Sequence, residues 1–89
     1  MIYIMVSHKV ADFNNWKPVF DRDEQARKSF GVEVKKLFRS AEDPNDLHIL
    51  FEAPNEDSAK QCIARPELKE LMIQAGVISE PVFKLLNIA

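Results

Sequence analysis

The chain has 89 residues, of which 46% are hydrophobic, and its 12 basic and 14 acidic residues give a net charge of −2. A chain of this length forms a single domain, residues 1–89, and hides roughly 60 to 65% of the surface that it exposes when unfolded. No block of like charges marks a phosphate-binding surface, and no run approaches roughly 18 consecutive apolar residues, so we expect neither a nucleic-acid nor a membrane partner.

The cysteine content indicates the cellular compartment of the protein. Cys62 is the only cysteine, which excludes an intramolecular disulfide and a cysteine-based zinc site, and we interpret it as a small buried hydrophobe within a helix. A lone thiol suits a reducing compartment, and the apolar start MIYIMV lacks the charged leader of a signal peptide, so we expect a cytoplasmic protein. Because so apolar a small chain has no disulfide framework, we also expect it to hide surface against a second copy, as a homodimer.

Residues 2–10 alternate between two largely apolar rows, which predicts a strand that is covered on both sides. One row contains Ile2, Ile4, Val6 and Val10, and His8 is its only polar member. A buried imidazole normally has a hydrogen-bond partner or a chemical task. We therefore expect His8 to be the residue of this strand that matters most chemically.

A helix is expected between Asp12, a good N-cap residue, and Gly31, a glycine that can end the helix in the left-handed conformation. Its apolar positions recur at helical spacing: Phe13, Trp16, Val19, Phe20, Ala26 and Phe30. Pro18 would displace a backbone hydrogen bond in a helix that begins at Asp12. We therefore predict a bent entry, in which residues 12–14 form a separate turn before the main helix.

The outer face of this helix carries charged pairs. Asp23/Arg27 and Glu24/Lys28 stand in the favourable i,i+4 order, in which a pair contributes about a few tenths of a kcal/mol to a helix. We interpret both pairs as a solvated face and not as part of a site.

Residues 32–40 and 47–53 flank the segment AEDPND, whose Asp-Pro and Asn-Asp steps predict the turn of a β-hairpin. With Ser40 opposite Leu47, the more hydrophobic face of the hairpin should lie beneath the helices. That face contains the pairs Phe38/Ile49, Lys36/Phe51 and Val34/Ala53. The other face contains Arg39/His48, Leu37/Leu50 and Lys35/Glu52, the last of which is expected to be a cross-strand ion pair at a dimer face.

The last third of the chain predicts two helical segments and a strand. Asn55 is expected to cap the first segment, Pro66 to restart the helix and Gly76 to end it. The inward-facing positions are Ala59, Cys62, Ile63, Leu68, Leu71, Met72 and Ala75. A final strand follows Pro81 and contains Val82, Phe83, Leu85 and Leu86.

The element order β-α-β-β-α-β predicts a ferredoxin-like α+β fold, with a four-stranded antiparallel sheet and the helices on one face. The opposite face would be left bare although its strands are partly apolar. We expect the same face of a second subunit to cover it.

The element order and two segments of this chain resemble the dimeric α/β-barrel superfamily, which includes antibiotic-biosynthesis-monooxygenase-like domains and small bacterial proteins without an assigned activity. The segments are HKVADFNNWKPVF and FEAPNEDSAKQCIARPELKELM, and the resemblance covers essentially the whole chain. Monooxygenase-like members usually carry a tryptophan after the third strand, a histidine in the helix before the proline and another histidine after it. This chain has Pro54, Cys62 and Glu67 at those places.

The two histidines, His8 and His48, should lie at the same end of the sheet, because the first and third strands run antiparallel. A shift of one residue in register decides whether they share a face. If they do, His8, His48, Arg39 and Trp16 would rim a pocket between the sheet and the helix entrance. Two further candidates have structural explanations: Asp12 as a helix cap, and Tyr3 as a core aromatic whose hydroxyl needs one partner.

Two classes of function stay open. The first is a binding protein with a pocket for a small apolar or aromatic molecule, lined by Trp16, His48, Arg39, Asp12 and Tyr3. The second is a cofactor-independent enzyme, similar to a monooxygenase, cyclase or isomerase, with His8 as the general base. No metal site and no cofactor are expected, since scattered histidines without metal-binding spacing are a weak metal signal.

Overall fold

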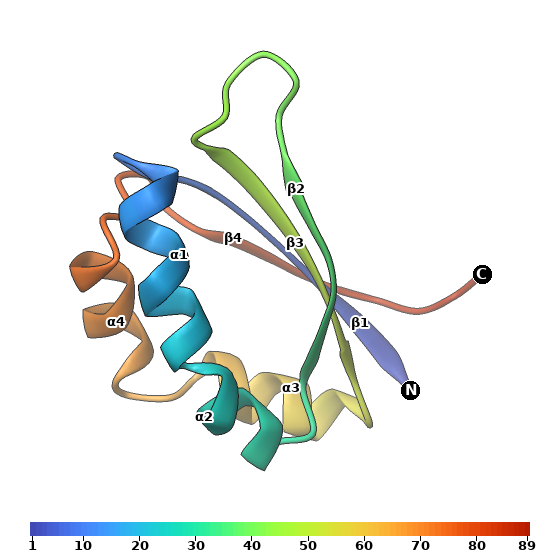
Figure 1. Cartoon of the computed structure of the whole chain (residues 1–89). Helices are drawn as coiled ribbons and strands as arrows, with labels where there is room; N and C mark the ends of the chain where they lie inside the picture. The colour runs from blue at the N-terminus through green and yellow to red at the C-terminus, as the bar shows by residue number, and fades with distance from the viewer.

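The computed structural model describes all 89 residues. Four strands form one antiparallel sheet in the order β2-β3-β1-β4. Along the chain the elements are β1 (Ile2–Lys9), α1 (Phe13–Arg22), α2 (Glu24–Ser29), β2 (Glu33–Arg39), β3 (Asp46–Ala53), α3 (Glu56–Ile63), α4 (Leu68–Gln74) and β4 (Val82–Leu86). All helices lie on one side of the sheet and leave the other side, the open face, uncovered, so the predicted ferredoxin-like α+β fold is confirmed (Figure 1).

The hydrophobic core lies between the sheet and the helices. Every second residue of β3 is buried, in the order Leu47, Ile49, Phe51 and Ala53, and the residues between them face the open side. On the central strand β1, Ile4, Val6 and His8 lie on the same side as this row. The longest helix has 10 residues, and none of the helices could cross a lipid bilayer.

The first helix begins directly at Phe13. Asp12 caps it, since its Oδ1 accepts a hydrogen bond from the backbone N–H of Asn14 at 2.9 Å. The predicted bent entry is wrong, because α1 continues through Pro18, whose ring is exposed to solvent. The helix is interrupted further on, at Asp23, where α1 ends and α2 begins.

Both glycines adopt the left-handed conformation that the sequence predicts. Gly31 has a φ of 75° and Gly76 a φ of 82°, and each follows the end of a helix. A Cβ atom at Gly31 would also lie 3.0 Å from Cγ of Pro54, so this position requires glycine for space as well as for conformation.

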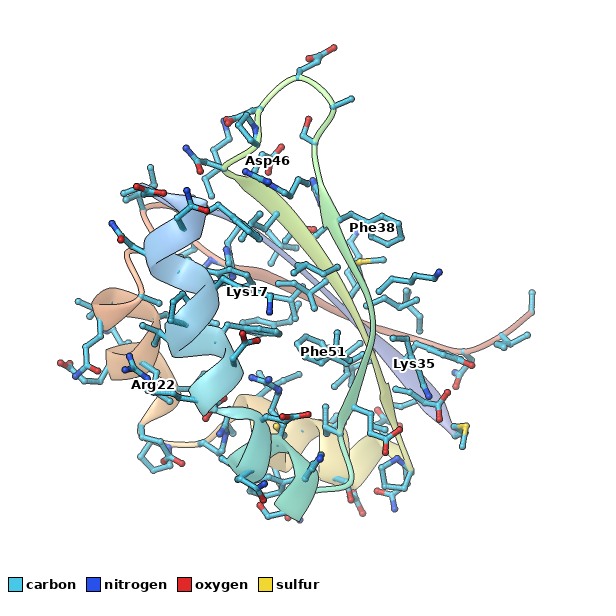
Figure 2. All side chains as sticks on the ribbon, viewed as in Figure 1. Lys17, Arg22, Lys35, Phe38, Asp46 and Phe51 are labelled. Carbon is cyan, nitrogen blue, oxygen red and sulfur yellow. The ribbon has the colours of Figure 1, made fainter.

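The hairpin of β2 and β3 has a register one residue away from the predicted one. Phe38 lies opposite His48, and Leu37 lies opposite Ile49, whereas the sequence predicts Phe38 opposite Ile49. Leu37 therefore lies beneath the helices. In Figure 2, Phe51 points from β3 toward the helices and Phe38 projects from β2 to the other side. The predicted faces of β2 are wrong for this part of the strand.

The turn of the hairpin explains the shift. The backbone N–H of Ser40 donates to the carbonyl of Asp46 at 2.9 Å, so the hairpin closes at these residues and not at Ser40 and Leu47. Asp43 shapes the turn, because its carboxylate accepts from the N–H of Asn45 at 2.9 Å and its carbonyl from the N–H of Asp46 at 3.1 Å.

A β-bulge between Val34 and Lys36 shifts the register by one further residue near the start of β2, so that Val34 lies opposite Phe51 and on the predicted face of the strand. It brings Nζ of Lys35 to 3.8 Å from the carboxylate of Glu52 on β3. The predicted cross-strand ion pair is therefore confirmed, although the register that surrounds it differs.

Candidate functional site

The inner pocket is a cavity of about 90 Å³ between the sheet and the helices. Hydrophobic residues make up 15 of the 19 that line it, so the few polar groups at its wall decide what it can bind. One wall is the helix side of β1 and β3, with Ile4 and Phe51, and the facing wall includes Trp16 and Phe20 of α1. The polar groups gather in two places, at His8 and around Arg27.

His8 lies at the pocket wall and is 5% exposed. Its Nδ1 is buried and has no hydrogen-bond partner in the protein. The ring meets Trp16 edge-on, with 5.9 Å between the ring centroids. Burial lowers the pKa of His8 below its usual value of 6.5, because desolvation penalises the charged imidazolium. The imidazole is therefore neutral at neutral pH and can donate one hydrogen bond and accept another.

His48 lies on the opposite face of the sheet from His8. The register pairs it directly with Ser7, whose hydroxyl lies 2.8 Å from Nδ1 of His48. Its Nε2 lies 3.5 Å from the carboxylate of Asp46 on the same strand. The histidines are at the same end of the sheet, as the sequence predicts, but they do not share a face, so His48 does not line the inner pocket.

The other candidate residues are dispersed. Trp16 is 3% exposed and lines the inner pocket. Asp12 caps α1, and Arg39 is exposed, with its guanidinium 4.0 Å from the ring centroid of Phe13. Tyr3 is half-buried on the open face, where its neighbours across the strands are Glu52 and Leu86, so the interpretation of Tyr3 as a core aromatic is wrong. The structure brings only His8 and Trp16 together at the pocket.

The structure adds three charged residues to the pocket wall: Asp23, Arg27 and Arg65. Nη1 and Nη2 of Arg65 donate to the two carboxylate oxygens of Asp23, each at 2.9 Å. The side chains of Asp23 and Arg27 are 11% and 7% exposed, so the prediction that this pair belongs to a solvated face is wrong. The spacing in the sequence contains a signal for this burial. Arg27 follows Phe20 by seven residues, which places it on the buried stripe of the helical repeat.

Arg27 packs against aromatic rings. Its guanidinium carbon lies 4.0 Å from the ring centroid of Phe20 and 5.9 Å from that of Phe51. Its Nη1 donates to the carbonyl of Phe20 at 3.0 Å, which satisfies one of the last carbonyls of α1 where this helix ends. Burial lowers the pKa of Arg27, and the hydrogen bonds to Asp23 raise the pKa of Arg65. Both guanidinium groups nevertheless stay charged at neutral pH.

Cys62 also lines the inner pocket and is a free, buried thiol. Burial raises the pKa of this thiol, so it is protonated at neutral pH and is a poor nucleophile. The interpretation of Cys62 as a small buried hydrophobe is confirmed. The structure contains no group of three or more His, Cys, Asp and Glu side chains with the geometry to hold a metal ion.

A second cavity, the outer pocket, has a volume of about 430 Å³ and is lined by residues between the end of α3 and β4. It shares five lining residues with the inner pocket: Ile63, Arg65, Leu68, Met72 and Phe83. Because these side chains border both cavities, the outer pocket is the candidate entrance to the inner one.

Comparison with known proteins identifies the fold. No protein-family model and no curated protein match the chain. Among solved structures, SnoaB, a cofactor-independent oxygenase from Streptomyces nogalater, is 14% identical, with a TM-score of 0.76 over 99% of this chain and 92% of the other. A structure described as an antibiotic biosynthesis monooxygenase is 14% identical, with a TM-score of 0.71 over 100% and 99% of the two chains.

A conserved protein from Methanosarcina mazei Go1 is 19% identical, with a TM-score of 0.72 over 94% of this chain and 88% of the other. Identities this low establish a shared fold and no shared activity. The chain therefore has the fold of the antibiotic-biosynthesis-monooxygenase-like structures, which agrees with the resemblance in its sequence.

Proposed function

We propose that this protein binds a small aromatic molecule in the inner pocket, as a homodimer of the cytoplasm. The observation that supports this most is His8, a buried residue of the pocket wall whose Nδ1 has no hydrogen-bond partner in the protein. A buried polar atom without a hydrogen bond costs roughly 1 to 3 kcal/mol. A ligand that forms a hydrogen bond with the imidazole would remove this cost.

The lining of the inner pocket supports an aromatic ligand. Trp16, Phe20 and Phe51 present ring faces and edges to it, and stacked or edge-on contacts between aromatic rings are favourable. Its volume of about 90 Å³ is well below the several hundred Å³ of pockets for drug-sized ligands. The inner pocket therefore suits a compound with a single ring, and larger substituents would extend into the outer pocket.

The test replaces each histidine separately. In His8→Gln we expect single-ring aromatic compounds to bind about tenfold more weakly, because the ligand loses its hydrogen bond to the imidazole. His48→Gln is the matched control, since His48 lies at the same end of the sheet on the other face, and it should leave binding unchanged. NMR titration followed at the backbone amides of α1 measures binding in both variants, and the His8 imidazole resonances report it in the wild type and in His48→Gln. Equal losses in the two variants, or no response of His8 to any aromatic compound, would contradict the proposed site.

The open face supports the homodimer. Across the strands it carries Phe38, Leu50, Met5, Val82 and Leu86. Three of these are well exposed in the single chain: Phe38 is 48% exposed, Val82 52% and Leu86 39%. Lys36 and Lys84 lie at the two ends of the row that contains Leu50 and Met5, so apolar residues at the centre of the face are bordered by charged ones. An exposed apolar patch with a polar border is typical of a surface that pairs with another subunit.

Sedimentation tests the dimer. At micromolar concentration the protein should sediment with about twice the chain mass of 10.2 kDa, and its unfolding midpoint should rise with protein concentration. Leu50→Lys places a charge in the middle of the open face and should yield monomers. Ile73→Lys, at an exposed position of α4, is the control and should leave the mass unchanged. A wild-type mass of a single chain would remove the open face as an interface.

A second candidate function is a cofactor-independent enzyme with His8 as the general base. The observation in its favour is that burial lowers the pKa of His8, which keeps the imidazole unprotonated and able to accept a proton at neutral pH. We rank it below binding because Pro54, Cys62 and Glu67 replace the tryptophan and histidines usual in the monooxygenase-like relatives. Of these three residues only Cys62 lines the inner pocket.

A further inference from the structure

We infer that the ligand of the inner pocket is a single-ring aromatic anion, a carboxylate or phenolate, whose negative charge binds to Arg27. This inference rests on the proposed function and adds the chemical class of the ligand. It follows from the charge balance around Asp23, from the free donors of Arg27 and from the position of its guanidinium beside aromatic rings.

The charges around Asp23 do not balance. One carboxylate lies between two guanidinium groups, and Arg65 takes both of its oxygens at 2.9 Å. Arg27 reaches only one of these oxygens, at 3.4 Å, which is long for a charged hydrogen bond. The nearest other acid on its helix, Glu24, is exposed and lies 3.6 Å from Lys28. Arg27 is therefore a buried cation without a counter-ion of its own.

The guanidinium of Arg27 also has N–H donors that form no hydrogen bond within the protein. Its Nη1 forms the hydrogen bonds to Phe20 and Asp23, while Nε and Nη2 form none within the protein. A guanidinium carries five N–H donors in a planar fork, which matches the two oxygens of a carboxylate. Since Arg27 lines the inner pocket, an anion bound there can take these donors.

Neighbouring aromatic rings favour an aromatic anion over a simple inorganic one. The guanidinium lies over Phe20, and Phe20 in turn stacks on Trp16 with 4.6 Å between the ring centroids. A ligand ring in the inner pocket would contact these aromatic side chains while its charged substituent meets the edge of the guanidinium. An apolar cavity that ends in a cation sharing its one counter-ion with a second arginine selects for a molecule with the same two parts, a ring and a negative charge.

The inference is tested with benzoate and benzamide, which have the same ring and nearly the same shape but differ in charge. Each is titrated into the 15N-labelled protein, and binding is followed at the amides of α1 and α2 and at the His8 ring. We expect benzoate to bind about tenfold or more tightly than benzamide, because a charge-assisted contact is stronger than a neutral one. Arg27→Gln should abolish this preference. Lys28→Gln removes an equal charge from the exposed side of the same helix and should retain it.

The possible outcomes distinguish a failure of the anion site from a failure of the proposed aromatic pocket. If both compounds bind equally well, or if Arg27→Gln keeps the preference for benzoate, the anion site is wrong and the aromatic pocket stands. If neither compound binds, the proposed function fails and the inference fails with it. The ratio of the two affinities in the wild-type protein decides the matter even if Arg27→Gln does not fold.

Discussion

Replacing Asp23 by alanine is expected to destabilise the fold by about 3 to 5 kcal/mol, the cost of breaking a buried ion pair by removing one partner. The substitution leaves two buried guanidinium groups, those of Arg27 and Arg65, without any carboxylate. Arg65 is the more affected, because it loses two hydrogen bonds of 2.9 Å and its side chain is only 5% exposed. Denaturant unfolding monitored by circular dichroism measures the change in the free energy of unfolding.

Asp21→Ala is the control for this prediction. Asp21 lies two residues before Asp23 and forms an exposed ion pair with Lys17. Exposed pairs contribute about 0 to 1 kcal/mol, so the control should barely change the stability. If Asp23→Ala lowers the free energy of unfolding no more than Asp21→Ala does, water reaches the guanidinium groups in solution. The ion pairs of Asp23 are then not buried.

Trp16→Ala is expected to cost about 3 to 5 kcal/mol, as for other large aromatic residues removed from a core. Trp16 stacks on Phe20, contacts Phe13 with 5.8 Å between ring centroids and meets His8 edge-on. Its removal leaves a cavity next to the inner pocket, which the rigid sheet cannot close. The measurement is again denaturant unfolding, followed by circular dichroism because Trp16 is the only tryptophan and its fluorescence is lost in the variant.

Ile73→Ala is a matched control for this loss of hydrophobic volume, since Ile73 is 61% exposed on α4. Surface substitutions of this kind usually change the stability by less than about 0.5 kcal/mol. A Trp16→Ala variant that is as stable as wild type but no longer binds aromatic compounds would show that Trp16 serves the ligand and not the core.

The elements of the fold could be predicted because their signals are local. Residues close together in the sequence determine the alternation in β1 and the helix caps at Asp12 and Asn55. The same holds for the glycine stops at Gly31 and Gly76. The bent entry predicted from Pro18 is wrong because α1, capped by Asp12, accommodates the one missing backbone donor on its exposed side.

Nearby residues predict that the hairpin forms, but they do not determine its register. The sequence marks the turn clearly, but the side-chain period of two means that a loop one residue shorter exchanges the faces of β2. This exchange decides which of Leu37 and Phe38 joins the core.

The charged end of the inner pocket could not be predicted from spacing along one helix. Asp23 and Arg27 satisfy the rule for an exposed i,i+4 pair, and Arg65, which donates two hydrogen bonds to Asp23, lies 42 positions after it. Only the tertiary contact between Arg65, which follows the end of α3, and Asp23 at the junction of α1 and α2 brings these groups together. The burial of the row that contains His8 can be predicted, because it depends on alternation within a single strand.

The bulge in β2 lies at an edge of the sheet, where it affects whether another strand can pair with the sheet. β2 is an edge strand, and an edge with regular free N–H and C=O groups invites another strand to add to the sheet. The bulge interrupts that regular row, and Lys35 and Lys36 place positive charges beside it. At the other edge, β4 follows Pro81 and carries Lys84 at its centre. Both borders of the sheet thus carry features that disfavour the addition of another strand.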